Sequence, residues 1–195
     1  AGRYWLDFGN TGGVAAVFHV YAGNRTDGPW VYTVEAGKKL SDYWSAVALT
    51  QGNYDFSVHG ANGFLRQFKG NVSTATSVGH ANPEVAACYE LTRRNIVLTL
   101  RNTGDTPCRL SVTNGYGSAA ARDFSLSAGA SVEDTWDLAT SDGWYDLSIT
   151  ADTGDGFLRR FAGHVETGQP SKSDPKLDLP PPPVIPADPP PPVGP

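Results

Sequence analysis

The amino-acid sequence predicts an all-β protein built from two tandem β-sandwich units and a proline-rich tail. Three features support this fold class: motifs that recur at a nearly constant offset, alternation of apolar and polar residues, and prolines gathered at the C-terminal end. Of the 15 prolines in 195 residues, only Pro29, Pro83 and Pro107 precede Pro170. Because such a segment has no core to fold around, we expect the tail to be disordered.

The repeat extends over most of the chain. Asn10-Thr11-Gly12 recurs as Asn102-Thr103-Gly104, an offset of 92 residues. The longest match aligns GFLRQFKG at residues 63–70 with GFLRRFAG at residues 156–163, and six of the eight positions are identical. Matched motifs in the same order indicate a duplicated structural unit. The expected organisation is copy one over residues 1–75, a linker over 76–90, copy two over 91–168 and the tail over 169–195.

Strands account for the residue pattern inside each copy. Residues 14–20 and 96–100 are rich in β-forming side chains, and residues 54–58 and 145–149 alternate apolar with polar side chains. Turn-forming Asn, Asp and Gly residues separate these runs, and no run keeps a helical period. We therefore predict six or seven strands in each copy, arranged as an immunoglobulin-like or jelly-roll-like sandwich.

The hairpin near residue 62 fixes which side chains face the core. A three-residue loop over residues 61–63 places Phe64 and Phe68 beside the apolar residues of the preceding strand, whereas a two-residue turn places them beside its polar residues. The corresponding loop of copy two, residues 152–156, is two residues longer, which preserves the parity. We predict the three- and five-residue loops. The expected inner-face residues are Tyr54, Phe56, Val58, Phe64 and Phe68, with Tyr145, Leu147, Ile149, Phe157 and Phe161 as counterparts.

Composition and motifs exclude several classes of function. The net charge of −5, from 15 basic and 20 acidic residues, argues against a nucleic-acid partner and against electrostatic docking on anionic lipid. The four histidines lack metal-ligand spacing, and no nucleophile motif is present. The stretch from Asp152 to Gly156 resembles a calcium loop but lacks its later acidic ligand, so we expect a turn. We predict no catalytic residue, metal site or cofactor in this chain.

Comparison of the two copies separates structural tryptophans from candidate contact residues. Trp44 and Trp136 occupy matching positions and are predicted core residues. Trp30 and Trp144 have no counterpart in the other copy. Two interpretations remain open for this second pair: packing in loops or between the units, or exposed aromatic side chains that contact lipid or another ligand.

Arg66 and Arg159 lie between two phenylalanines on the predicted inner face. A buried guanidinium needs a partner, because an unpaired buried charge costs several kcal/mol. We predict structural ion pairs, and an anion site for a phosphate headgroup is the alternative. The candidate carboxylates are Asp42, Asp134, Asp55 and Asp146.

The chain contains two cysteines, Cys88 and Cys108, and no methionine. Two cysteines are too few for a disulfide scaffold or a zinc knuckle, and a single bridge between them remains open. Because even the initiating methionine is absent, we expect the chain to be a processed product or an excised piece.

These motifs together resemble the C-terminal region of secreted bacterial phosphocholine-preferring phospholipases C, which carries two consecutive copies of a small β domain. The resemblance covers about residues 3–168, and the proline-rich tail lies outside it. It rests on YWLDFGN at residues 4–10, YDFSVHG at 54–60 and GFLRQFKG at 63–70, and in copy two on WYDLSI at 144–149 and GFLRRFAG at 156–163.

The resemblance implies an accessory role. In that family, hydrolysis of phosphatidylcholine or sphingomyelin belongs to a large N-terminal domain similar to acid phosphatases, and none of its catalytic residues maps onto this chain. The implied protein is secreted by a bacterium, and its partners are its own catalytic domain and a membrane that contains phosphatidylcholine. The implied task is membrane docking or stabilisation of the catalytic domain. The alternative is a free-standing carbohydrate-binding or adhesive sandwich.

Overall fold

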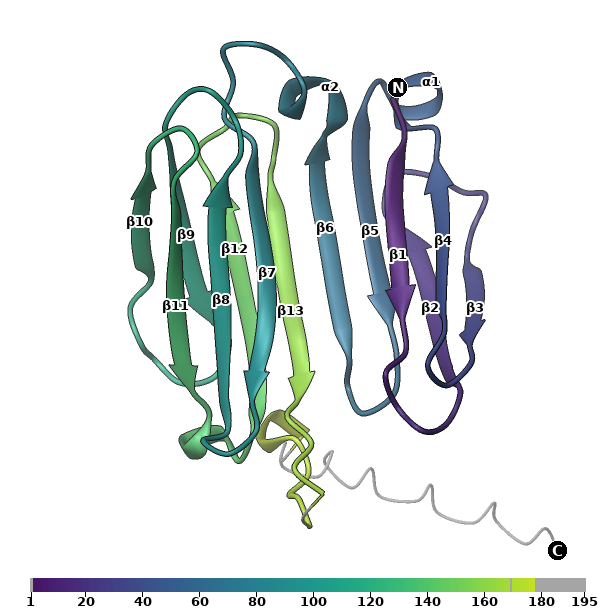
Figure 1. Ribbon diagram of the computed structural model, residues 1–195, viewed down its shortest axis with the longest axis vertical. Coiled ribbons are helices and arrows are strands. Elements are labelled where there is room, and N and C mark those ends of the chain that lie inside the picture. Colours follow the sequence, from purple (N-terminus) through teal and green to yellow (C-terminus); the bar gives the residue numbers. More distant parts are fainter. Residues whose placement is uncertain (1, 169, 178–195) are drawn as a thin grey trace, which may run out of the picture.

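The computed structural model describes residues 2–168 and 170–177, and nearly all of its regular structure is antiparallel β-sheet (Figure 1). Most of the predicted tail, residues 178–195, lies outside the described residues. Copy one contains β1 (Tyr4–Gly9), β2 (Ala16–Ala22), β3 (Trp30–Val34), β4 (Lys39–Trp44), α1 (Ala46–Thr50), β5 (Asn53–His59), β6 (Leu65–Asn71) and α2 (Val72–Ala75).

Copy two contains one strand more than copy one. Its elements are β7 (Pro83–Glu90), β8 (Asn95–Asn102), β9 (Cys108–Asn114), β10 (Arg122–Leu126), β11 (Ser131–Asp137), the 3₁₀ turn η1 (Ala139–Ser141), β12 (Trp144–Ala151) and β13 (Leu158–His164). A second 3₁₀ turn, η2 (Pro175–Leu177), follows. The predicted linker over residues 76–90 is therefore partly wrong, because its second half is the strand β7 and pairs with β8.

The two copies share one continuous sheet. Eight strands run in the order β10-β9-β12-β13-β6-β5-β2-β3, so copy two supplies one half and copy one the other. The β1–β4 pair covers the copy-one half, and the three-stranded sheet β11-β8-β7 covers the copy-two half (Figure 1). The sequence predicts two sandwiches in a row, but their edge strands β6 and β13 pair with each other.

The predicted hairpin parity is confirmed in both copies. Phe56 lies opposite Phe68, and the loop that closes this hairpin consists of residues 61–63. In copy two, Thr150 lies opposite Leu158; one further step of the same register places Ala151 opposite Phe157 and leaves the five residues 152–156 between them. All five predicted inner-face residues of copy two are buried, and in copy one Phe64 and Phe68 are only half-buried.

The repeated Asn-Thr-Gly motif has the same structural role in each copy. The side-chain amide of Asn10 donates to the carbonyl oxygens of Val14 and Val34, at 2.7 and 2.9 Å. Asn102 donates in the same way to the carbonyl oxygens of Thr106 and Leu126. Such bonds satisfy backbone acceptors where the chain leaves a strand, which accounts for the recurrence of the residue.

Each copy has its own hydrophobic core between the two layers. The copy-one core is aromatic: the Trp44 ring lies 4.6 Å from Phe56, and Tyr4 stacks on Tyr54 at 4.1 Å. The copy-two core is mainly aliphatic, and Trp136 lies within it. Trp44 and Trp136 are both buried, as predicted.

Cys88 and Cys108 are both free thiols. Cys88 is exposed on β7 in the three-stranded sheet, whereas Cys108 is buried at the start of β9 in the eight-stranded sheet. The disulfide left open by the sequence is therefore absent from the structure. Burial, with Asp152 nearby, raises the pKa of the Cys108 thiol above its ordinary value.

We expect the two thiols to react at very different rates with iodoacetamide in the native protein. Cys88 should alkylate readily, and Cys108 should alkylate only after unfolding, because it is buried and its thiolate is disfavoured. Mass spectrometry of the non-reduced protein gives the count of modified thiols. Protection of both cysteines that disappears on reduction would contradict the free-thiol structure.

Candidate functional site

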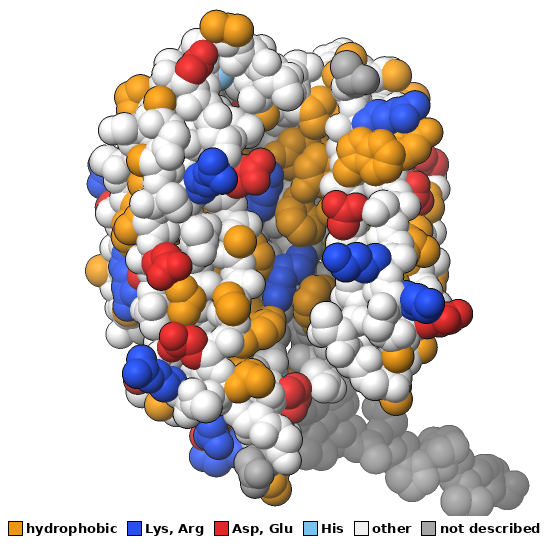
Figure 2. Space-filling view, in the orientation of Figure 1, with side chains coloured by type: hydrophobic (Ala, Val, Ile, Leu, Met, Phe, Trp, Pro, Cys, Tyr) orange, Lys and Arg blue, Asp and Glu red, His pale blue; other side chains and the backbone are white. Residues whose placement is uncertain are grey.

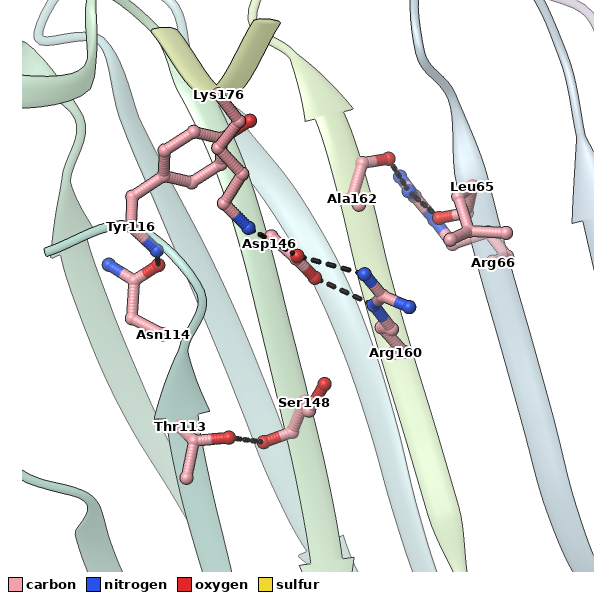
Figure 3. A network of polar contacts seen from close by, with 10 residues as sticks. All are labelled: Leu65, Arg66, Thr113, Asn114, Tyr116, Asp146, Ser148, Arg160, Ala162 and Lys176. Atoms are coloured by element: carbon pink, nitrogen blue, oxygen red, sulfur yellow. Dashed lines mark hydrogen bonds and ion pairs between the residues drawn. The ribbon is translucent and has the colours of Figure 1, made fainter. Parts of the chain in front are cut away.

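The junction of the two units is the antiparallel pairing of β6 with β13, which we call the seam. Arg66 on β6 reaches across it: its Nη1 donates to the carbonyl oxygen of Ala162 on β13 at 3.1 Å, and to that of Leu65 at 2.8 Å (Figure 3). Its Nη2 donates to the hydroxyls of Tyr89 and Tyr145, at 2.7 and 3.2 Å. The guanidinium carbon lies 4.3 Å from the centre of the Phe64 ring.

Arg159 on β13 makes the reciprocal contacts. Its Nη1 donates to the carbonyl oxygens of Lys69 on β6 and of Leu158, both at 3.0 Å. Its Nη2 donates to the hydroxyl of Tyr54 at 3.0 Å, and its guanidinium carbon lies 4.4 Å from the Phe157 ring centre. The two arginines thus bind each unit to a carbonyl of the other, and they explain the repeated Leu-Arg-X-Phe motif.

A glycine on each seam strand makes room for a core tyrosine that the arginine of the other seam strand contacts. A side chain at Gly70 would lie 2.4 Å from the Tyr54 hydroxyl, and one at Gly163 would lie 2.8 Å from the Tyr145 hydroxyl. Both glycines have a φ of +151°, which other residues rarely adopt. Steric and conformational constraints together account for glycine at the end of both repeated motifs.

The structure corrects the ion pairs expected for these arginines. In the described part of the chain, the four candidate aspartates are bonded elsewhere. Asp42 accepts from the Tyr32 hydroxyl at 2.6 Å, and Asp134 pairs with Arg122 at 2.5 Å. Asp55 pairs with Lys69 at 2.9 Å, and Asp146 pairs with Arg160 at 2.7 Å. Carbonyl and hydroxyl oxygens take the place of carboxylates around Arg66 and Arg159, because strand pairing brings the carbonyls of the other unit within reach.

Asp146 organises a second polar cluster on the copy-two half of the eight-stranded sheet (Figure 3). Arg160 holds it with two hydrogen bonds, and Lys176 contributes a third at 3.1 Å. Burial alone would raise the pKa of Asp146, but the bonds from Arg160 and Lys176 outweigh it and hold the pKa below its ordinary value. Lys176 also lies 4.6 Å from the Tyr116 ring centre, so residues near 176 are attached to copy two.

Trp144 is held by the first residues of the predicted tail. Its indole Nε1 donates to the carbonyl oxygen of Lys172 at 3.0 Å, and its ring lies 4.9 Å from that of His164. Lys172 forms an ion pair with Asp142 at 3.1 Å. Residues 170–177 therefore pack against copy two, where the sequence predicts a disordered tail.

Trp30 packs into the aromatic core of copy one. Its ring lies 5.2 Å from Trp44 and 6.3 Å from Phe56, and the guanidinium carbon of Arg25 lies 5.7 Å from its centre. Trp30 and Trp144 are each half-buried, and both make intramolecular contacts. Of the two interpretations that the sequence leaves open for this pair, these contacts favour packing.

An aromatic pair that sequence comparison does not single out is exposed instead. Trp5 on β1 and Tyr43 on β4 lie opposite each other on the outer face of the two-stranded sheet, with ring centres 4.8 Å apart. Trp5 is 52% exposed and Tyr43 is 40% exposed. The guanidinium of Arg3 lies 3.9 Å from the Tyr43 ring centre. We call these three residues the outer aromatic patch; strand parity in copy one is the signal that points to them.

A polar cleft of about 610 Å³ opens where β5 and β6 meet a loop of copy two. It is lined by the Asp55–Lys69 ion pair and by Asp155, whose carboxylate accepts from the backbone N–H of Asn71 at 3.1 Å. Across residues 2–168 and 170–177 no group of three or more potential metal ligands gathers. Within the same residues, no helix has the length and apolar character needed to cross a membrane.

Comparison with known proteins establishes the family. The family model described as "Bacterial phospholipase C, C-terminal domain" matches residues 1–71 and 83–164. The chain belongs to this family. A non-hemolytic phospholipase C of Burkholderia pseudomallei is 56% identical over 177 residues, covering 90% of this chain and 25% of that protein. A hemolytic phospholipase C of Pseudomonas aeruginosa is 39% identical over 202 residues, covering 92% of this chain and 27% of that protein.

The chain spans about a quarter of the length of the curated phospholipases C that it matches. The second matched stretch begins at Pro83, the first residue of β7, so the family model includes that strand. Among solved structures, a GH2 β-galacturonidase of Eisenbergiella tayi matches with a TM-score of 0.27 and 13% identity, covering 81% of this chain and 34% of that protein. A likeness of that size supports no conclusion about fold or function.

Replacing a seam arginine by methionine should destabilise the chain by about 2–4 kcal/mol, because charge-assisted bonds to carbonyl and hydroxyl oxygens are lost while the strands stay paired. We expect Arg66→Met and Arg159→Met to lower the unfolding midpoint in urea to similar extents. Arg101→Met, at an exposed position on β8, is the matched control and should change it little. Equal midpoints for the seam variants and this control would show that the arginines do not stabilise the seam.

Because of Asp146, the free energy of unfolding should fall at low pH. Its pKa is lowered from 3.8 in the folded protein, so its contribution is complete above pH 3.8 and is lost as the pH falls through the lower folded pKa. Asp146→Asn should therefore be less stable than wild type at neutral pH, and the difference should shrink below about pH 4. Thermal unfolding between pH 2 and pH 7 measures this, with Glu133→Gln as an exposed carboxyl control. A difference independent of pH would contradict the assignment.

Proposed function

We propose that this region is a non-catalytic accessory part of a secreted phospholipase C, and that the outer aromatic patch contacts the phosphatidylcholine-containing membrane that is the enzyme's substrate. The observation that carries the proposal is the exposure of Trp5, at 52%, beside Tyr43 and Arg3. Tryptophan and tyrosine are enriched at membrane–water interfaces, where the ring enters the apolar region and the polar atoms stay hydrated.

The chemistry of the patch suits a zwitterionic lipid better than an anionic one. The net charge of −5 gives no general attraction to a negative surface, so apolar burial has to supply the binding energy. The guanidinium of Arg3 lies beside Tyr43, where it can contact a lipid phosphate while the aromatic rings insert. The names of the curated relatives, phospholipases C, favour a lipid surface over a glycan.

The expected affinity is low. Burying the exposed parts of two aromatic side chains, at about 25 cal/mol/Å², yields at most about 5 kcal/mol before ordering costs. That corresponds to a dissociation constant no tighter than about 0.1 mM. Weak binding fits an accessory region that raises the residence time of an attached enzyme at a surface, because tethering converts a weak second contact into an intramolecular one.

We expect the chain to co-sediment weakly with phosphatidylcholine vesicles, with little dependence on salt. The double variant Trp5→Ala/Tyr43→Ala should lose binding, because it removes the side chains that insert. Tyr21→Ala is the matched control, since Tyr21 is 45% exposed on β2, in the eight-stranded sheet and away from the patch. The fold of each variant is checked by circular dichroism.

The proposal of membrane contact fails if the wild-type chain does not co-sediment at any vesicle concentration up to millimolar lipid. It also fails if the double variant binds as well as the wild type. In either case, stabilisation of the catalytic domain would be the better account of this region.

A further inference from the structure

The inner edge of β1 is open in this structure, although the corresponding edge of β8 is covered. Among the described residues, β1 pairs only with β4, whereas β8 pairs with β11 on one side and β7 on the other. The backbone N–H of Asn10 donates toward β4, to Lys38, so even-numbered residues face that strand. By the alternation of antiparallel pairing, Trp5, Asp7 and Gly9 direct their backbone groups toward the open edge.

The core beneath this edge is incompletely covered. A groove of about 200 Å³ runs between β1 and β6, lined mainly by apolar side chains, with Asp7 and Arg66 as its charged residues. Figure 2 shows a hollow at this position between the units, with hydrophobic and basic side chains on its floor. Phe18, Phe64 and Phe68 are only partly buried here. Their counterparts in copy two, beneath the sheet that contains β7, are buried: Leu110, Phe157 and Phe161.

The backbone just before β1 has the shape of the turn that connects β7 to β8. Arg94, immediately before β8, has a left-handed φ of 53°, and Gly2, its counterpart at the offset of 92, has a φ of 82°. Each also accepts a hydrogen bond from the segment that follows the paired strand: the Arg94 carbonyl from Leu138, at 3.2 Å, and the Gly2 carbonyl from Val47, at 3.0 Å, which is one residue beyond the counterpart of Leu138. The chain therefore enters β1 in the conformation in which it leaves a tight hairpin turn.

Gly12 gives independent evidence. Its counterpart Gly104 has to be glycine, because a side chain there would lie 2.3–2.7 Å from backbone atoms of residues 80–82, which lead into β7. A side chain at Gly12 would meet only the Asn10 side chain, at 3.2 Å. A segment that passes over Gly12 as residues 80–82 pass over Gly104 would explain the second glycine.

We propose that, in the longer protein, the polypeptide immediately preceding residue 1 forms an antiparallel strand on the open edge of β1 and covers the groove. The occupant is a β-strand followed by a tight turn into Gly2, with apolar side chains at alternate positions, as in β7. The relatives carry about three quarters of their length outside the matched region, and the family is described as a C-terminal domain, so preceding chain is available to supply the strand. Such a strand would attach the preceding domain directly to copy one. The outer aromatic patch, on the outer face of the two-stranded sheet, would remain uncovered.

The test compares the 195-residue chain with the same chain extended by the natural residues encoded before it. Hydrogen exchange should slow at the backbone amides of Trp5, Asp7 and Gly9 in the extended chain, and it should be unchanged at Leu6 and Phe8, which already face β4. A third chain, in which a copy of residues 80–93 is placed before Gly2, is the positive control for occupation of the edge. Equal exchange in the natural extension and the 195-residue chain, with protection in this control, overturns the proposal.

A glycine substitution tests whether the occupant is a strand placed beside β1 as β7 is placed beside β8, or a domain surface that lies over the edge. Gly104→Ala should lower the melting temperature of both chains. Gly12→Ala should leave the 195-residue chain nearly unchanged and should destabilise the extended chain. Tolerance of Gly12→Ala in the extended chain overturns the proposal, even if the edge is protected. Neither measurement involves lipid, so its outcome is independent of the proposed membrane contact.

Discussion

The antiparallel pairing of β6 with β13 is the constraint on which the arrangement of the molecule depends. It joins two units into one eight-stranded sheet and removes two edges that would otherwise expose unpaired backbone groups. Arg66 and Arg159 reinforce it by donating across the pairing to carbonyl oxygens of the opposite unit. Each arginine also donates a hydrogen bond to the hydroxyl of a core tyrosine. The same two side chains therefore contact both the strand pairing and the two cores.

The two units differ in the strand edges and apolar side chains that they leave uncovered. In copy two β7 covers the edge of β8, and residues 170–177 pack nearby, whereas in copy one the corresponding edge of β1 is unpaired among the described residues and lies beside a groove. Copy one also carries the exposed aromatic pair. Open edges and exposed apolar side chains are features that soluble proteins normally cover or use. The edge, the groove and the aromatic pair on which our proposals rest all belong to copy one.

The chain spans only part of the phospholipases C that it matches, and both proposals depend on that relation. The chain matches a quarter of each curated phospholipase C, and its described residues contain no cluster of metal ligands. An accessory region can promote a surface reaction in two ways: by adding contact with the surface and by holding the catalytic domain in a fixed position. We propose the outer aromatic patch for the first purpose and the inner edge of β1 for the second.

Local patterns in the sequence determined the strands, the hairpin parity and the inner faces, because side-chain alternation depends only on neighbouring residues. Comparison of the copies also identified Trp44 and Trp136 as core residues. Tertiary structure alone decided that the two units share a sheet and that Arg66 and Arg159 bind carbonyls rather than aspartates. It also decided that the predicted linker contains a strand and that Trp5 is more exposed than Trp30 or Trp144. These features depend on which edges meet across long sequence separations, and no local period records that choice.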